Sequence, residues 1–229
     1  MNDVIPLGRR CLAELLGSAA LLAIVVGSGI MGERLAGGND AIALLANSIA
    51  TGAGLFVLIT TLGPLSGAHF NPVVSLMDWW HGRLRGRETA AYIVSQLLGA
   101  AAGVVLANLM FDLAPVTLSP KTRASVGLWL SEGVATAGLL LTIVLGVRHR
   151  AEAVPALVAS YITAAYWFTA STSFANPSVT LARTLTDTFA GIAAVDALIF
   201  IGAQLVGAVI GIVCARLLLG STRQTRSAA

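Results

Sequence analysis

The chain has 229 residues, of which 56% are hydrophobic and 11% are charged, and its formal net charge is +3. Soluble domains carry about 25% charged residues, so this composition excludes an ordinary soluble enzyme. The basic residues lie in short clusters between apolar runs rather than along one stripe, which excludes a nucleic-acid-binding chain as well. We expect a multi-pass protein of the lipid bilayer, with one membrane domain over residues 1–229.

Six stretches are free or nearly free of charge, and four of them have the length of a single crossing, which needs about 20 residues. They are 11–32, 41–77, 89–111, 124–147, 153–182 and 197–215. The stretches 41–77 and 153–182 are too long for one span and too short for two, and each contains an Asn-Pro pair in its second half. We interpret each as a full helix followed by a segment that re-enters the membrane. Non-helical backbone at membrane depth is tolerated only where it is buried or lines a watery cavity, so the two segments predict a pore.

The basic residues also predict the orientation of the spans. One side of the membrane receives Arg9, Arg10, Arg83, Arg85, Arg87, Arg148, Arg150, Arg216, Arg223 and Arg226. The other side receives only Arg34, Lys121, Arg123 and Arg183. The positive-inside rule then places both termini in the cytoplasm. We expect the membrane to be the plasma (inner) membrane. Cys11 and Cys214 would lie near the cytoplasmic face as unpaired thiols.

Three motifs occur in the same order in two halves of the chain, about 11–110 and about 126–219. The paired motifs are Glu14-Leu-Leu-Gly with Glu132-Gly-Val-Ala, Asn71-Pro-Val-Val with Asn176-Pro-Ser-Val, and Gln96-Leu-Leu-Gly with Gln204-Leu-Val-Gly. Each half has three full spans, an odd number, so the second half is inverted relative to the first. Interrupted segments at corresponding positions of inverted repeats place a permeation site near the bilayer midplane.

The two Asn-Pro pairs are typical of helix starts. Asn caps free backbone N–H groups, and Pro suits the first helical position. Asn71 and Asn176 should therefore begin two half-helices whose positive ends meet in mid-membrane. For a monovalent cation roughly 5 Å away, at an effective dielectric constant of about 20, the two dipoles give a repulsion of about 3 kcal/mol. A neutral solute meets no such barrier.

Two carboxylates and one histidine within the apolar runs need an interpretation. An intramembrane carboxylate suggests a proton relay by default. The symmetric placement of Glu14 and Glu132, one in each half, favours instead a structural role as acceptors for the N–H groups of the re-entrant loops. We expect His69 to line the pore. No cluster of His, Cys and carboxylates has metal-ligand spacing, and no glycine-rich phosphate loop is present, so we expect no metal and no cofactor.

With its repeats and the segment Ser66-Gly-Ala-His-Phe-Asn-Pro, the chain resembles the aquaporin and aquaglyceroporin family over about residues 11–219. The resemblance implies an all-α fold of six transmembrane helices with two re-entrant half-helices. It also implies passive flux of water and small neutral solutes, no enzymatic activity, and a homotetramer with one pore per subunit. The family's two boxes would correspond to Asn71, Pro72, Val73 and to Asn176, Pro177, Ser178.

The resemblance also implies a constriction nearer the outside, at four positions carried over by their spacing from the boxes. These positions are Thr51, Ala164, Ser173 and Val179. The family normally has Arg where this chain has Val179, and the usual aromatic residues are absent from the other three positions. Arg183 lies one helical turn beyond Val179, toward the outer mouth. It is a candidate either to replace the missing charge or to lie at the protein surface. The set resembles that of a bacterial subgroup associated with arsenic resistance, which implies a wide filter for glycerol, urea and uncharged metalloid acids such as arsenous acid.

Two alternatives remain open from the sequence. An anion or weak-acid channel could share the plan of two half-helices. An intramembrane serine hydrolase could use Ser66 and His69, which would need a hydrogen bond between their side chains. If the pore passed water but excluded glycerol and urea, Phe174 or Tyr166 would be the side chain suspected of narrowing it.

Overall fold

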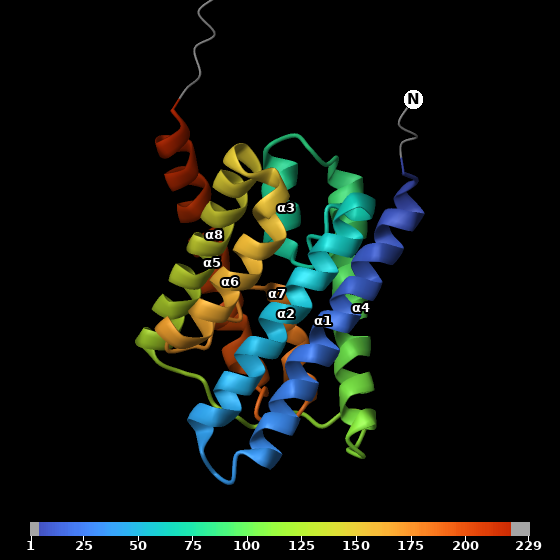
Figure 1. Cartoon of the computed structure of the whole chain (residues 1–229), viewed down its shortest axis with the longest axis vertical. Helices are drawn as coiled ribbons and strands as arrows, with labels where there is room; N and C mark the ends of the chain where they lie inside the picture. The colour runs from blue at the N-terminus through green and yellow to red at the C-terminus, as the bar shows by residue number, and fades with distance from the viewer. Residues whose placement is uncertain (1–4, 221–229) are drawn as a thin grey trace, which may run out of the picture.

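The computed structural model describes residues 5–220, and within that range it is a helical bundle without strands (Figure 1). The longer helices are α1 (Leu7–Leu35), α2 (Asp40–Ser66), α4 (Gly86–Met110), α5 (Val126–His149), α6 (Val154–Phe168) and α8 (Ala194–Leu219). Two short helices, α3 (Pro72–Trp80) and α7 (Pro177–Ala182), lie between them, and 3₁₀ turns cover Ala151–Ala153 and Arg183–Leu185. The start of α1 and the end of α8 lie at the same end of the bundle (Figure 1). Arg223 and Arg226, which entered the orientation argument, lie outside the described residues.

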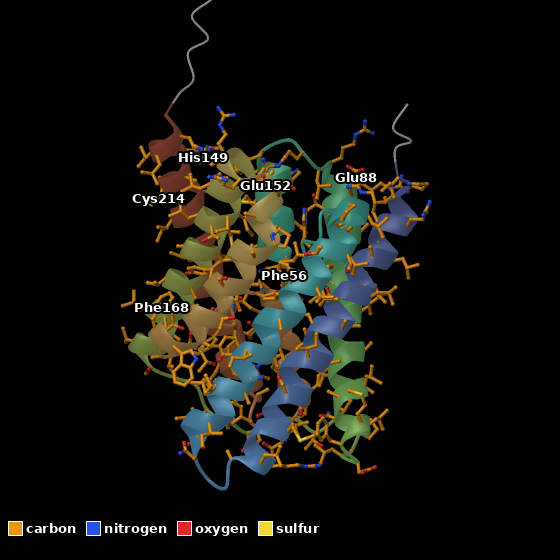
Figure 2. All side chains as sticks on the ribbon, in the orientation of Figure 1. Phe56, Glu88, His149, Glu152, Phe168 and Cys214 are labelled. Carbon is orange, nitrogen blue, oxygen red and sulfur yellow. The ribbon has the colours of Figure 1, made fainter. Side chains whose placement is uncertain are left out.

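The predicted all-helical membrane fold with two short inserted helices is confirmed, with one correction to the spans. Within the described residues, α1, α2, α4, α5 and α8 are long and apolar enough to cross a membrane. Helix α6 has 15 residues, or about 22 Å, which is less than the roughly 30 Å of a hydrocarbon core. It is short because it ends at Phe168, where the chain turns into the second re-entrant loop. Phe56 on α2 and Phe168 on α6 are exposed on the outside of the bundle, as lipid-facing side chains would be (Figure 2).

The two halves of the chain use the same close helix crossing. Helix α1 packs on α4, and α5 packs on α8. A Cβ atom at Gly99 of α4 would overlap the carbonyl oxygen of Leu15, and one at Gly207 of α8 would overlap the carbonyl oxygen of Gly133. Only glycine permits this approach of two backbones. The paired crossings form the frame that holds α3 and α7 inside the bundle.

Candidate functional site

The two short helices begin at the asparagines of the Asn-Pro pairs. The Oδ1 atom of Asn71 accepts a hydrogen bond from Val73 N at 3.1 Å, and Pro72 occupies the first position of α3. The Oδ1 atom of Asn176 accepts one from Ser178 N at 3.0 Å, and Pro177 begins α7. Both starts follow the local rule for helix N-termini, in which a side-chain oxygen satisfies backbone donors that have no helical partner.

The asparagine side chains also tie the two loops together. Asn71 Nδ2 donates to the carbonyl oxygen of Ala175 at 2.8 Å, and Asn176 Nδ2 donates to that of Phe70, also at 2.8 Å. The N-termini of α3 and α7 therefore meet head to head inside the bundle. Each amide nitrogen carries two hydrogens, so one N–H of each asparagine is left for a passing molecule.

Glu14 and Glu132 hold the two loops in the same way. Each carboxylate is fully buried and accepts four hydrogen bonds, two from backbone N–H groups of its loop, one from a serine and one from a glutamine. The backbone donors are His69 and Phe70 for Glu14, and Phe174 and Ala175 for Glu132. The loops need such acceptors because their buried backbone N–H groups have no helical partner. In these loops Phe70, Ser173 and Ala175 also adopt positive φ angles, which non-glycine residues rarely adopt outside constrained sites.

A cavity of about 310 Å³ passes the point where the two asparagines meet. Among the residues singled out in the sequence, its lining includes Thr51, His69, Asn71, Ser173, Asn176, Val179 and Arg183. Neither Glu14 nor Glu132 belongs to the lining. A proton-relay role along the pore therefore has no geometric support, and their contacts are those of loop anchors.

The structure contradicts the placement of Ala164 in the constriction. Ala164 is exposed and does not belong to the cavity lining, whereas Ile162 and Tyr166 do. Residues in a helix turn by about 100° each, so a position two residues from a lining residue faces the other way. Tyr166 occupies the place instead, and its hydroxyl oxygen lies 3.2 Å from the Oγ1 atom of Thr51.

Arg183 and Phe174 line the part of the cavity beside α7. The Arg183 side chain is buried, with 4% of the residue exposed, and its Nε atom donates to the carbonyl oxygen of Ala190. Its guanidinium carbon lies 3.4 Å from the ring centroid of Phe174. Among the described residues it has no carboxylate partner within ion-pair distance. A buried cation with free N–H groups thus borders the cavity. It lies close to Val179, the position at which the resemblance led us to expect an arginine.

Ser173 adds an unpaired hydroxyl to the same region. Its Oγ atom is buried and has no hydrogen-bond partner within residues 5–220, although the residue lines the cavity. Buried polar groups are nearly always hydrogen-bonded. A hydroxyl of this kind suits a site that pairs with a molecule inside the pore.

The loop that precedes α5 carries two further cations, Arg123 and Lys121. Arg123 Nε donates to the carbonyl oxygen of Gly191 at 3.0 Å, and its guanidinium carbon lies 5.2 Å from the Phe174 centroid. Burial lowers the pKa of Arg123, and burial together with the nearby Arg123 charge lowers the pKa of Lys121. The Lys121 ammonium lies 5.4 Å from the ring centroid of Phe189 instead. The sequence placed both residues outside the spans but gave no signal that Arg123 lies near Phe174.

At the other end of the cavity, His69 belongs to a polar network. Its Nδ1 atom lies 3.0 Å from Ser75 Oγ and its Nε2 atom lies 3.1 Å from a carboxylate oxygen of Asp78, which also pairs with Arg83. Ser66 Oγ donates to Glu14 at 2.6 Å. The Ser66–His69 hydrogen bond that a serine hydrolase would need is therefore absent between these two side chains. No group of three or more His, Cys, Asp or Glu side chains within residues 5–220 could hold a metal ion.

Comparison with known proteins decides the family. Residues 3–165, more than half of the chain, match the model of the major intrinsic protein family. The chain belongs to the major intrinsic protein family. This major intrinsic protein is 58% identical over 217 residues to the aquaglyceroporin AqpS of Rhizobium meliloti (strain 1021), a match that covers 95% of this chain and 93% of that protein. It is 35% identical over 114 residues to the aquaporin AqpM of Methanothermobacter marburgensis, covering 44% and 46% of the two chains.

The fold of this major intrinsic protein is similar to that of a solved aquaglyceroporin. The X-ray structure of the aquaglyceroporin from Plasmodium falciparum superposes with a TM-score of 0.72 at 19% identity, covering 93% of this chain and 97% of that one. The protein is accordingly a membrane channel of the aquaglyceroporin type and not an enzyme.

Proposed function

We propose that this channel passes water together with glycerol, urea and uncharged metalloid acids such as arsenous acid, and that it excludes ions. The observation that carries the proposal is the mixed lining of the outer cavity. Ser173, the Thr51–Tyr166 pair and Arg183 offer hydroxyl and N–H groups, while Val179 and Phe174 offer apolar surface. A solute with several hydroxyl groups and a carbon or metalloid centre can contact both kinds of surface at once. The similarity to a protein named aquaglyceroporin supports the same solute class.

The constriction in this proposal differs from the one implied by family spacing. It comprises Thr51, Tyr166, Ser173, Val179 and Arg183, with Phe174 beneath the guanidinium. Val179 leaves open the space that an arginine would fill at that position, and Arg183 supplies the charge from the next turn. We propose that this arrangement is wider than a strict water filter.

We further propose that both termini are cytoplasmic, that the protein lies in the plasma (inner) membrane, and that it forms a homotetramer with one pore per subunit. The arginine distribution supports the orientation. The homotetramer is proposed from the family to which the chain belongs. The single-domain organisation with two inverted repeats, about 11–110 and 126–219, is part of the same proposal.

The test of the solute class is uptake into proteoliposomes at neutral pH. We expect arsenous acid, which is uncharged there, to enter protein-containing vesicles much faster than empty ones, and arsenate, which is an anion, to enter neither. Entry of arsenate, or an anion current across a planar bilayer, would favour the anion-channel alternative. Failure of arsenous acid, glycerol and urea to enter would contradict the proposal.

Arg183→Gln is expected to weaken the exclusion of cations. A positive charge roughly 5 Å from a permeating cation, at an effective dielectric constant of about 20, raises its energy by about 3 kcal/mol, which is roughly a hundredfold in rate. The variant should therefore gain a potassium conductance in planar bilayers while its glycerol permeability is retained. Arg34→Gln is the matched control, since Arg34 is exposed and does not line the cavity. An unchanged conductance in Arg183→Gln, or an equal gain in both variants, would show that Arg183 does not set the cation barrier.

A further inference from the structure

A second cavity, of about 270 Å³, lies on the outside of the bundle between α3 and α8. Its walls include Leu76, Trp79 and Trp80 from α3, and Leu205, Val209 and Val213 from α8. The two tryptophans and the three α8 residues are exposed, so the cavity is an open groove on the surface. It shares only Met77 with the pore cavity. We call it the α3–α8 groove.

One end of the α3–α8 groove is cationic. Arg216 lies in the last turn of α8 and lines the groove, and its guanidinium carbon is 5.7 Å from the ring centroid of Trp80. Within the described residues, 5–220, its side chain has no carboxylate within ion-pair distance. The groove therefore joins an apolar wall to an uncompensated positive charge, at the end of the bundle where α1 begins and α8 ends (Figure 1).

The residues of the α3–α8 groove match the groups that a lipid presents at successive depths of the membrane. Tryptophan and arginine side chains favour the level of the lipid headgroups, and aliphatic side chains favour the level of the acyl chains. A phospholipid presents its groups in the same order from the membrane surface inward, first an anionic phosphate and then apolar acyl chains. Basic residues at the mouths of such grooves attract anionic headgroups.

A second copy of the chain fits the α3–α8 groove less well. From Leu205 to Val213, the exposed residues of α8 are all bulky aliphatic ones. The small residues Gly207 and Gly211, which would let another helix approach closely, are buried against α5 instead. A protein partner would also have to bring a carboxylate into the membrane surface to pair with Arg216.

We propose that the α3–α8 groove binds an anionic phospholipid from the leaflet on the side of the termini. One acyl chain lies between α3 and α8, and the phosphate pairs with Arg216 beside Trp80. Because α3 also begins at Asn71 of the pore, the bound lipid braces the half-helix and raises the thermal stability of the channel. This proposal needs only the membrane placement of the protein and does not depend on which solute it carries.

The test measures lipid binding to the purified, delipidated full-length protein by native mass spectrometry and its melting temperature by light scattering. The probes are phosphatidylglycerol and phosphatidylcholine with identical acyl chains. We expect phosphatidylglycerol to bind several-fold more tightly and to raise the melting temperature more. Arg216→Gln should remove that preference, and Val209→Trp, which fills the groove but keeps the charge, should lower binding of both lipids at this site.

Arg9→Gln is the matched control, because Arg9 is an exposed cation at the same end of the bundle, on α1 and outside the groove. It should bind both lipids as the parent does. An unchanged preference in Arg216→Gln, or an equal loss in Arg9→Gln, would overturn the proposal in favour of general surface charge. Loss of oligomers in Val209→Trp with lipid binding intact would overturn it in favour of a contact between copies of the chain.

Discussion

Val179→Arg is expected to slow glycerol and arsenous acid by about tenfold or more, an increase of about 1.4 kcal/mol in their barriers, while water slows less. Val179 is three residues beyond Asn176, about 4.5 Å along α7, and it is buried and lines the cavity. An arginine there would fill space beside Thr51 and Tyr166 and would offer N–H donors that water can still use. Stopped-flow light scattering of proteoliposomes measures the three permeabilities.

The control for this substitution separates size from charge. Arg183 lies one turn further along, and two cations at that distance repel each other, so the guanidinium introduced at position 179 could be turned aside. The double variant Val179→Arg with Arg183→Ala removes the repulsion, and Val179→Leu adds bulk without charge. If all three variants fold and pass glycerol at the parent's rate, Val179 is not part of the constriction.

Glu14→Ala is expected to destabilise the channel severely while leaving its selectivity unchanged in the fraction that folds. The substitution leaves the buried N–H groups of His69 and Phe70 without an acceptor, and each such loss costs about 1–3 kcal/mol. The measurement is the yield of folded protein in detergent and its melting temperature, and Glu132→Ala should behave alike because its loop has the same contacts.

Glu152→Ala is the control for the carboxylates, since Glu152 is exposed at the end of the bundle where α6 begins (Figure 2). It should fold as the parent does. A Glu14→Ala protein with normal yield and melting temperature but altered proton permeability would refute the anchor role and support a relay.

The parts of the fold that follow local rules could be predicted from the sequence. Asn71 and Asn176 begin helices because capping involves only the next few residues. The repeat of Glu14 and Glu132 predicted the anchoring of two loops because buried N–H groups need acceptors wherever they lie. These inferences needed no knowledge of how distant segments pack.

The lining of the proposed constriction could not be predicted as well, because it depends on how far each element extends. Counting a fixed number of residues back from Asn176 led to Ala164. The loop between α6 and α7 is not helical, so a residue count across it does not tell which side of α6 faces the cavity. A different signal was available: Val154, Val158, Ile162 and Tyr166 recur every four residues and all line the cavity. No sequence pattern predicted that the Arg183 guanidinium would lie on the ring of Phe174.

The ratio of glycerol to water permeability, measured in one preparation of proteoliposomes by stopped-flow light scattering, tests the central claim most directly. The claim is that a cavity bordered by Ser173, Tyr166, Val179 and Arg183 admits neutral solutes larger than water. It predicts that glycerol enters at a rate comparable to that of water, with both rates well above those of empty vesicles. Rapid water flux with glycerol entry no faster than in empty vesicles would contradict it and would identify Tyr166 and Phe174 as the side chains that close the pore.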